Sequence, residues 1–83
     1  MSAQPRFRLF SRVGCALCDE MLGRLQAMPA AGLFPIDVVD IDEDPPARAR
    51  YAHKIPVLFF DGMLVCHGHL DAEEVHKALA LVR

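Results

Sequence analysis

The sequence lacks a long apolar run and a strong excess of charge of either sign. Apolar residues make up 53% of the 83 residues, which is enough for a core. No stretch approaches the roughly 18–20 apolar residues that cross a bilayer. The formal net charge is −2, with acidic and basic residues scattered along the chain. These absences argue against a membrane-spanning protein and against a protein that binds phosphate backbones, so we expect neither a membrane nor a nucleic acid as partner.

Cysteine is scarce, and a secretory signal is not expected. The chain has three cysteines, an odd number, and its first residues lead into only a short apolar run. This composition argues against a structural disulfide framework. It favours catalytic or metal-binding cysteines in a reducing compartment, so a cytoplasmic location is expected. We find no repeat, linker or low-complexity stretch, and residues 1–83 are interpreted as a single domain.

Two of the cysteines form a C-x-x-C motif, Cys15 to Cys18, between an apolar strand-like run at residues 7–10 and a helix-like run. A pair with this spacing can close and reopen a small disulfide ring. At a helix N-terminus, free backbone N–H groups and the helix dipole favour the thiolate, which is the species that attacks a disulfide. The motif therefore indicates redox chemistry. By itself it is also compatible with two buried structural cysteines or with half of a zinc site.

Hydrophobic periodicity predicts an α/β chain with the element order β-α-β-α-β-β-α. Strands are expected over residues 6–11, 34–41, 56–60 and 63–66. A helix is expected to begin at Cys15, with a buried face made of Leu17, Met21, Leu22, Leu25 and Met28. Asp44 and Asp71 are expected to cap the two other helices. Asp61-Gly62 predicts a tight hairpin turn between the last two strands.

The connections between these elements predict a four-stranded mixed sheet with helices on both faces. The first two strands are joined through a helix and should be parallel, whereas the hairpin strands must be antiparallel. This topology brings Pro56 and the segment Cys66 to His69 to the same end of the sheet as Cys15.

In these features the chain resembles a glutaredoxin-like member of the thioredoxin-fold superfamily, and especially the small bacterial glutaredoxin-like proteins. The resemblance extends over nearly the whole length. The segments that carry it are Ser11–Glu20, Asp40–Pro45, Lys54–Val57, Asp61–Gly62, Gly68 and Asp71. It implies a thioredoxin-like βαβαββα fold. Cys15, nearer the exposed start of the helix, is expected to be the nucleophile, and Cys18, one turn on, the resolving thiol.

The resemblance also implies how a substrate is held. This family places a cis proline opposite the cysteine pair, so a cis Ile55–Pro56 bond is expected, with the backbone of Ile55 pairing with an extended thiol substrate. Arg12 matches the basic residue that contacts the carboxylate of glutathione.

The turn that would hold the other end of glutathione matches only in part. Gly68 and Asp71 agree with the pattern of the family. His67 replaces a glycine of this turn, and Leu70 replaces the aspartate that contacts glutathione. The resemblance therefore implies disulfide chemistry with a weakened glutathione site.

The sequence thus predicts a thiol-disulfide oxidoreductase of electron transport. Its catalytic residues are expected to be Cys15 and Cys18, and its substrate-binding residues Arg12, Ile55, Pro56 and Gly68. No bound cofactor and no metal ligand are expected. The expected partners are a disulfide-containing protein or a small thiol, with glutathione or another thiol reductant as co-substrate, and the chain is expected to be a monomer.

Two other functions remain open. The same cysteines could belong to a metal or iron–sulfur module, with His67 or His69 completing a zinc site, or the chain could be a thioredoxin-fold interaction domain without turnover. Against the zinc site, both histidines are expected to be solvent-exposed and Cys66 is expected to be a small apolar strand residue.

Overall fold

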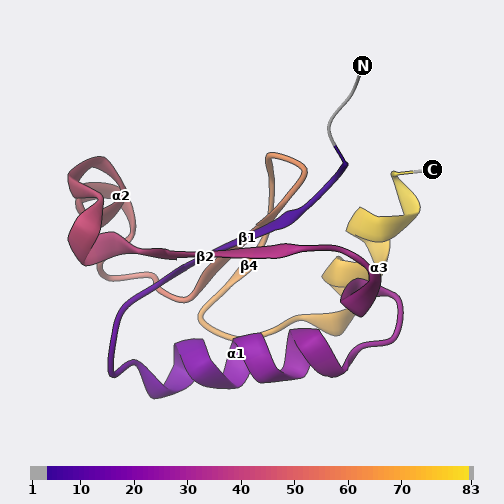
Figure 1. The fold of residues 1–83 in the computed structure, drawn as a ribbon, viewed down its shortest axis with the longest axis horizontal. Coiled ribbons are helices and arrows are strands. Elements are labelled where there is room, and N and C mark those ends of the chain that lie inside the picture. Colours follow the sequence, from indigo (N-terminus) through magenta and orange to yellow (C-terminus); the bar gives the residue numbers. More distant parts are fainter. Residues whose placement is uncertain (1–3, 83) are drawn as a thin grey trace.

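A computed structural model describes residues 4–82 of the chain. They form a four-stranded sheet in the order β2-β1-β3-β4, with helices packed against it (Figure 1). The strands are β1 (Phe7–Ser11), β2 (Ile36–Asp40), β3 (Val57–Phe60) and β4 (Met63–His67). The helices are α1 (Ala16–Ala27), α2 (Pro45–Tyr51) and α3 (Ala72–Ala80), with two short 3-10 helices, η1 (Ala31–Leu33) and η2 (Ile41–Glu43).

The sheet has the predicted mixed topology. Strand β1 pairs in parallel with β2, to which it is joined through α1, and antiparallel with β3. Strands β3 and β4 form the antiparallel hairpin. Their turn is made by Asp61 and Gly62, with φ of 51° and 82°, as a tight hairpin turn requires. The predicted thioredoxin-like βαβαββα order is therefore confirmed.

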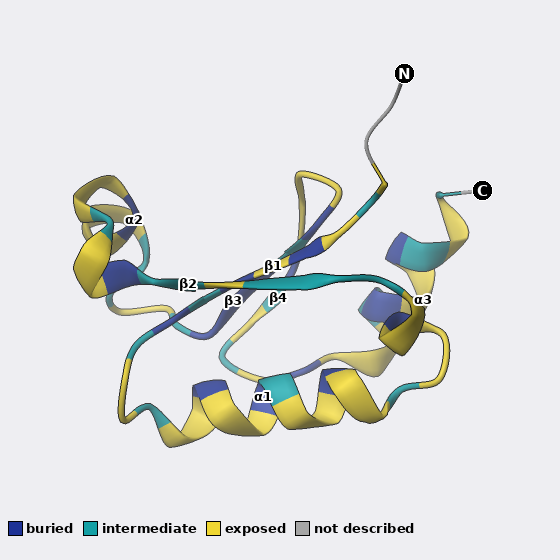
Figure 2. Ribbon diagram, in the orientation of Figure 1, coloured by how far each residue is buried: buried dark blue, intermediate teal, exposed yellow. Residues whose placement is uncertain are grey.

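Helices cover both faces of the sheet, with α1 and α3 on one side and α2 on the other (Figure 1). The main core lies on the α1 and α3 side, and Figure 2 shows the buried positions of α1 turned toward the sheet. Residues of this core from the sheet are Phe7, Leu9, Leu58, Phe60 and Val65, and those from the helices include Met21, Leu25, Val75 and Ala78. Strand β1 alternates buried and exposed positions, so its other face points toward α2.

Two sequence expectations needed correction. Leu17 is 46% exposed, and the buried residues of α1 are Cys18, Met21 and Leu25. One position along a helix is a rotation of about 100°, so the stripe that contains Cys18 leaves Leu17 at its margin.

The second strand covers Ile36–Asp40 rather than residues 34–41. At its start, Phe34 still belongs to the end of η1, since its N–H donates to the Ala31 carbonyl at 3.1 Å. At its end, the Asp40 carboxylate accepts from the Asp42 N–H at 2.9 Å and turns the chain into η2.

The helix caps follow the prediction. Asp44 accepts from the Ala47 N–H at 3.2 Å, and Asp71 accepts from the Glu74 N–H at 3.1 Å. In residues 4–82, none of the helices combines the length and the apolar character that a bilayer crossing needs.

Candidate active site

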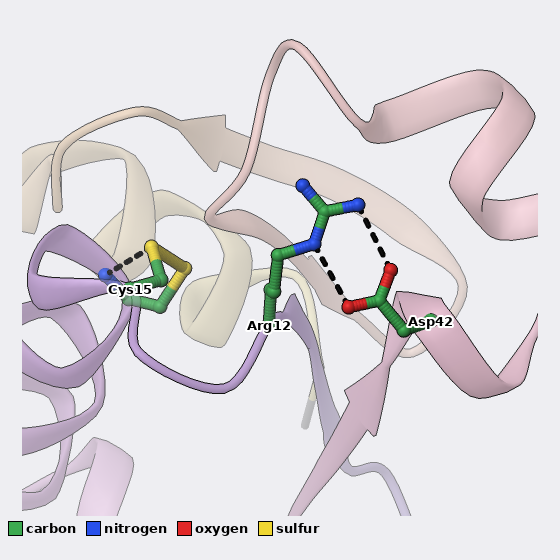
Figure 3. Close-up of a disulfide and its surroundings, with 4 residues drawn as sticks. Arg12, Cys15 and Asp42 are labelled. Carbon is green, nitrogen blue, oxygen red and sulfur yellow. Dashed lines mark hydrogen bonds and ion pairs between the residues drawn. A yellow bond between two sulfur atoms is a disulfide. The ribbon is translucent and has the colours of Figure 1, made fainter.

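Cys15 and Cys18 lie at the start of α1, after the loop that follows β1, and they are joined by a disulfide (Figure 3). Their Cα atoms are 5.2 Å apart. The loop between β1 and Cys15 turns through Gly14, whose φ of +80° is a left-handed conformation. No heavy atom would crowd a Cβ there, so the backbone conformation, rather than space, favours glycine at this position. The Cys15 N–H then donates to the Arg12 carbonyl at 3.2 Å and closes the loop.

The two sulfurs have different surroundings. Cys15 is the N-cap of α1 and is partly exposed, whereas Cys18 is 1% exposed. The Cys18 N–H donates to Cys15 Sγ at 3.2 Å. In the reduced protein, the same N–H is placed to donate to a thiolate at Cys15, where the positive end of the helix dipole adds to the effect. The geometry therefore offers one accessible, stabilised sulfur backed by one buried sulfur.

Arg12, which the sequence marked as a candidate for substrate binding, forms a bidentate ion pair with Asp42 (Figure 3). Its Nε donates to Asp42 Oδ2 at 3.0 Å and its Nη2 to Oδ1 at 2.9 Å. The hydrogen bonds from Arg12, followed by its positive charge, hold the pKa of the Asp42 carboxyl below its usual value. The positive charge of Arg12 is thus already paired next to the cysteine loop.

The loop before β3 reaches the same end of the sheet. The Ile55–Pro56 peptide bond is cis, and Val57 pairs with Phe10 near the end of β1. The Pro56 carbonyl accepts from the Gly68 N–H at 2.8 Å. This bond joins the loop before β3 to the turn after β4. The predicted convergence of Pro56 and the Gly68 turn with the cysteine end of β1 is therefore confirmed.

The backbone of Ile55 is partly engaged inside the protein. Its N–H donates to the Tyr51 carbonyl at 3.1 Å, at the end of α2. A substrate that paired with this residue would therefore meet its carbonyl rather than its N–H.

The end of β4 and the turn after it carry further polar and thiol groups at this end. His67 and His69 are exposed. Cys66 is half-buried against the core, and burial raises the pKa of its thiol. Leu70 is 8% exposed and belongs to the core, so its side chain is apolar and turned away from a ligand at this end. Across residues 4–82, no three His, Cys, Asp or Glu side chains gather as metal ligands would.

Sequence reasoning did not foresee the role of Asp42. The available signal was the parallel pairing of the first two strands, which the register now shows as Ser11 opposite Asp40. Residues just after two neighbouring parallel strands lie at the same end of the sheet. Arg12 directly follows Ser11, and Asp42 stands two residues after Asp40, within η2.

Comparison with known proteins agrees with this geometry. Residues 6–80 match the family described as Glutaredoxin-like domain (DUF836). An uncharacterized protein of Mycobacterium tuberculosis and its counterpart in Mycobacterium bovis are each 24% identical over 83 residues, covering 94% of this chain and 86% of the relative.

Two solved structures are similar in fold. A protein from Nitrosomonas europaea, solved by NMR in solution, has a TM-score of 0.78 and 28% identity, covering 93% of this chain and 96% of that one. Thioredoxin 1 from Thermosipho africanus has a TM-score of 0.60 and 18% identity, covering 92% and 91% of the two chains. The second likeness concerns the fold alone.

Proposed function

Because the chain belongs to the glutaredoxin-like domain family, we propose that it is a thiol-disulfide oxidoreductase that uses Cys15 and Cys18. The observation that carries this proposal is the asymmetry of the pair. Cys15 caps α1 and is partly exposed, and its sulfur accepts a hydrogen bond from the Cys18 N–H. Cys18 is buried one turn further along the helix. An accessible thiolate and a protected second thiol are what a two-step exchange needs.

The proposed reaction starts from the reduced dithiol. The Cys15 thiolate attacks one sulfur of a substrate disulfide, so a mixed disulfide forms and the other substrate sulfur leaves as a thiolate that takes up a proton. Cys18, after losing its proton, attacks Cys15 Sγ. The second substrate thiol leaves, and the Cys15–Cys18 disulfide seen in the structure is formed. Two electrons have passed to the substrate, and a thiol reductant must return them.

The surface around Cys15 suits an extended, partly apolar substrate. Val13 is 86% exposed and Leu17 46% exposed, so apolar side chains flank the nucleophile on both sides in the sequence. The Ile55 carbonyl is the proposed backbone contact, by analogy with strand addition. Pro56 and Gly68, joined by their hydrogen bond, are proposed to form the opposite wall.

Glutathione is proposed to be a poor co-substrate. Arg12 would have to exchange its two bonds to Asp42 for bonds to the glutathione carboxylate. His67 and the buried Leu70 offer no replacement for the missing turn contacts. Loss of a charge-assisted contact costs about 1.5–3 kcal/mol, or about one to two powers of ten in affinity. Another thiol reductant, such as a reduced dithiol protein, would serve better.

We further propose that the chain acts as a monomer in the cytoplasm, on disulfides of proteins or small thiols. A catalyst with a reversible dithiol is useful there, because the compartment supplies thiol reductants. No metal or cofactor is required by the proposed exchange.

The test is turnover on a protein disulfide, with dithiothreitol as electron donor. Cys15→Ser should reduce turnover to the uncatalysed rate. Cys18→Ser should slow it, because the mixed disulfide on Cys15 must then be released by dithiothreitol instead of by Cys18. Cys66→Ser is the matched control and should keep the turnover of the wild type. Turnover that survives Cys15→Ser, or that is lost with Cys66→Ser in a folded protein, would contradict the proposal. A wild-type protein with no turnover on any disulfide would favour an interaction domain instead.

A further inference from the structure

The face of the sheet that carries α2 holds a groove that the redox proposal does not use. The groove has a volume of about 470 Å³ and runs along β1 and β3 to the Asp61–Gly62 turn. This turn is at the opposite end of β3 from Pro56. Helix α2 has only seven residues and stands beside one end of the sheet (Figure 1). Pockets for small molecules typically measure about 300–1,000 Å³, so the groove is of a suitable size.

One end of the groove is an aromatic wall made of Phe10, Tyr51 and Phe59. The Phe10 and Tyr51 rings lie 4.8 Å apart and are tilted by 37°, and Phe59 meets Phe10 edge-on at 5.8 Å. All three side chains are partly exposed and all three line the groove. Aromatic rings that remain accessible offer a surface on which a further planar ring can stack.

A positively charged side chain, Arg8, lies next to this wall. Arg8 is directly opposite Phe59 on β3 and next to Asp37 on β2. Both oxygens of Asp37, however, are taken by Arg6, at 2.6 and 2.7 Å. Within residues 4–82, Arg8 itself makes no ion pair. Arg8 is exposed and lines the groove.

The acidic residue that lines the groove, Asp61, lies at the hairpin turn and not at the aromatic wall. Asp61 belongs to the hairpin turn, and its N–H donates to the Arg6 carbonyl at 3.0 Å. Phe60 pairs with Phe7, the first residue of β1, so Asp61 lies beyond the start of β1. Phe10 is near the other end of this strand. A bound anion would therefore sit at Arg8, between the turn and the aromatic wall.

We propose that this groove binds a small molecule that joins a planar aromatic ring to an anionic group. The ring packs against Tyr51 and Phe10, and the anionic group, whether carboxylate, sulfonate or phosphate, accepts hydrogen bonds from the Arg8 guanidinium. An arginine fork matches such groups in a bidentate manner. This binding is independent of the cysteine pair, so it stands or falls separately from the redox proposal.

The composition of the chain provides a direct reporter. It contains one tyrosine, Tyr51, and no tryptophan, so intrinsic fluorescence reports the groove alone. The probes are naphthalenesulfonate and its uncharged analogue naphthalenesulfonamide, which share the ring and differ in charge. In the wild-type protein, the sulfonate should change the fluorescence of Tyr51 and shift the amide NMR signals of Arg8, Phe10 and Phe59. The sulfonamide should bind more weakly.

Two variants test the charge. Arg8→Gln should weaken binding of the sulfonate about tenfold, because one charge-assisted contact is lost, and should leave binding of the sulfonamide unchanged. Arg24→Gln removes an exposed arginine from α1, on the other face of the sheet, and should change neither. Equal binding of the two probes, equal effects of the two substitutions, or amide shifts confined to α1 and α3 would overturn the proposal.

Discussion

The chemistry of a single residue, Cys15, depends on what reaches its sulfur. The Cys18 N–H donates to it at 3.2 Å, and the helix start adds a positive potential. The nearby Arg12 is expected to contribute little to this potential, since Asp42 pairs with its guanidinium. Local backbone, rather than a nearby free cation, is therefore expected to activate this cysteine.

The first prediction is that Cys15 is alkylated faster than Cys18 or Cys66 in the reduced protein near neutral pH. Cys18 is 1% exposed, and burial raises the pKa of the Cys66 thiol. Below that raised pKa, Cys66 stays protonated, so its labelling should become appreciable only at alkaline pH. Brief iodoacetamide treatment at neutral and alkaline pH, followed by mass spectrometry of the peptides, measures the order. Preferential labelling of Cys18 at neutral pH would show that the nucleophile has been assigned to the wrong sulfur.

The second prediction concerns Asp42. Asp42→Asn removes the charge that pairs with Arg12 and frees the guanidinium for a substrate carboxylate. Glutathione-coupled turnover should rise about tenfold, the value of one charge-assisted contact. The matched control is Asp37→Asn, which breaks the similar ion pair with Arg6 away from the cysteines and should have no effect. If the wild type shows robust glutathione-coupled turnover that Arg12→Ala abolishes, the ion pair with Asp42 does not prevent Arg12 from binding glutathione, and the prediction is wrong.

The Arg12–Asp42 pair also marks the limit of sequence reasoning at this scale. The C-x-x-C spacing and the position of Pro56 were sufficient to locate the cysteine pair and the loop that faces the same end. The partner of Arg12 depends on how β1 and β2 align. That alignment is set by packing of the whole sheet and leaves no local pattern in the sequence.

Among the elements, those with a local signal were predicted well. Both helix caps and the hairpin turn depend on residue types with a direct effect on the backbone, namely Asp44, Asp71 and Asp61-Gly62. The two 3-10 helices were not predicted, because such short turns have no hydrophobic period. The end of β2 was misplaced for the same reason. A carboxylate that folds back on the chain at Asp40 ended the strand.

The third prediction belongs to α3. Asp71→Ala removes the side chain that caps the helix through the Glu74 N–H and should lower the free energy of unfolding by about 1 kcal/mol. His76→Ala changes an exposed position of the same helix and serves as control, with a much smaller effect. Urea unfolding of the two variants measures the difference. Equal stabilities would show that the cap contributes little to this helix.

The whole molecule depends on one core between the sheet and α1 with α3. Phe60 is fully buried, and its ring centre lies 4.5 Å from that of Phe7 and 5.1 Å from that of Phe34. The fourth prediction is that Phe60→Ala lowers the free energy of unfolding by about 3–5 kcal/mol, through lost burial and the cavity left behind. Leu64→Ala, at a residue 59% exposed on β4, should change it far less. Similar urea midpoints for the two variants would contradict this account of the core.

At this scale the fold class was predictable because strand and helix periods alternate in a fixed order and the connections permit few topologies. That same topology brings three separated segments to one end of the sheet: the cysteine loop, the loop before β3 and the turn after β4. The groove beside α2 was not predictable. It arises where a short helix leaves part of a sheet face open, and its lining comes from residues far apart in the sequence.

The most direct test of the central claim is to trap the reaction halfway. Cys18→Ser removes the resolving thiol, so a substrate disulfide should leave one covalent adduct on Cys15 that a reductant releases. Mass spectrometry of the intact protein and its peptides locates the adduct, and Cys15→Ser is the control that should carry none. We predict a single adduct, on Cys15. An adduct on Cys66, or no adduct in the folded variant, would contradict the proposed exchange.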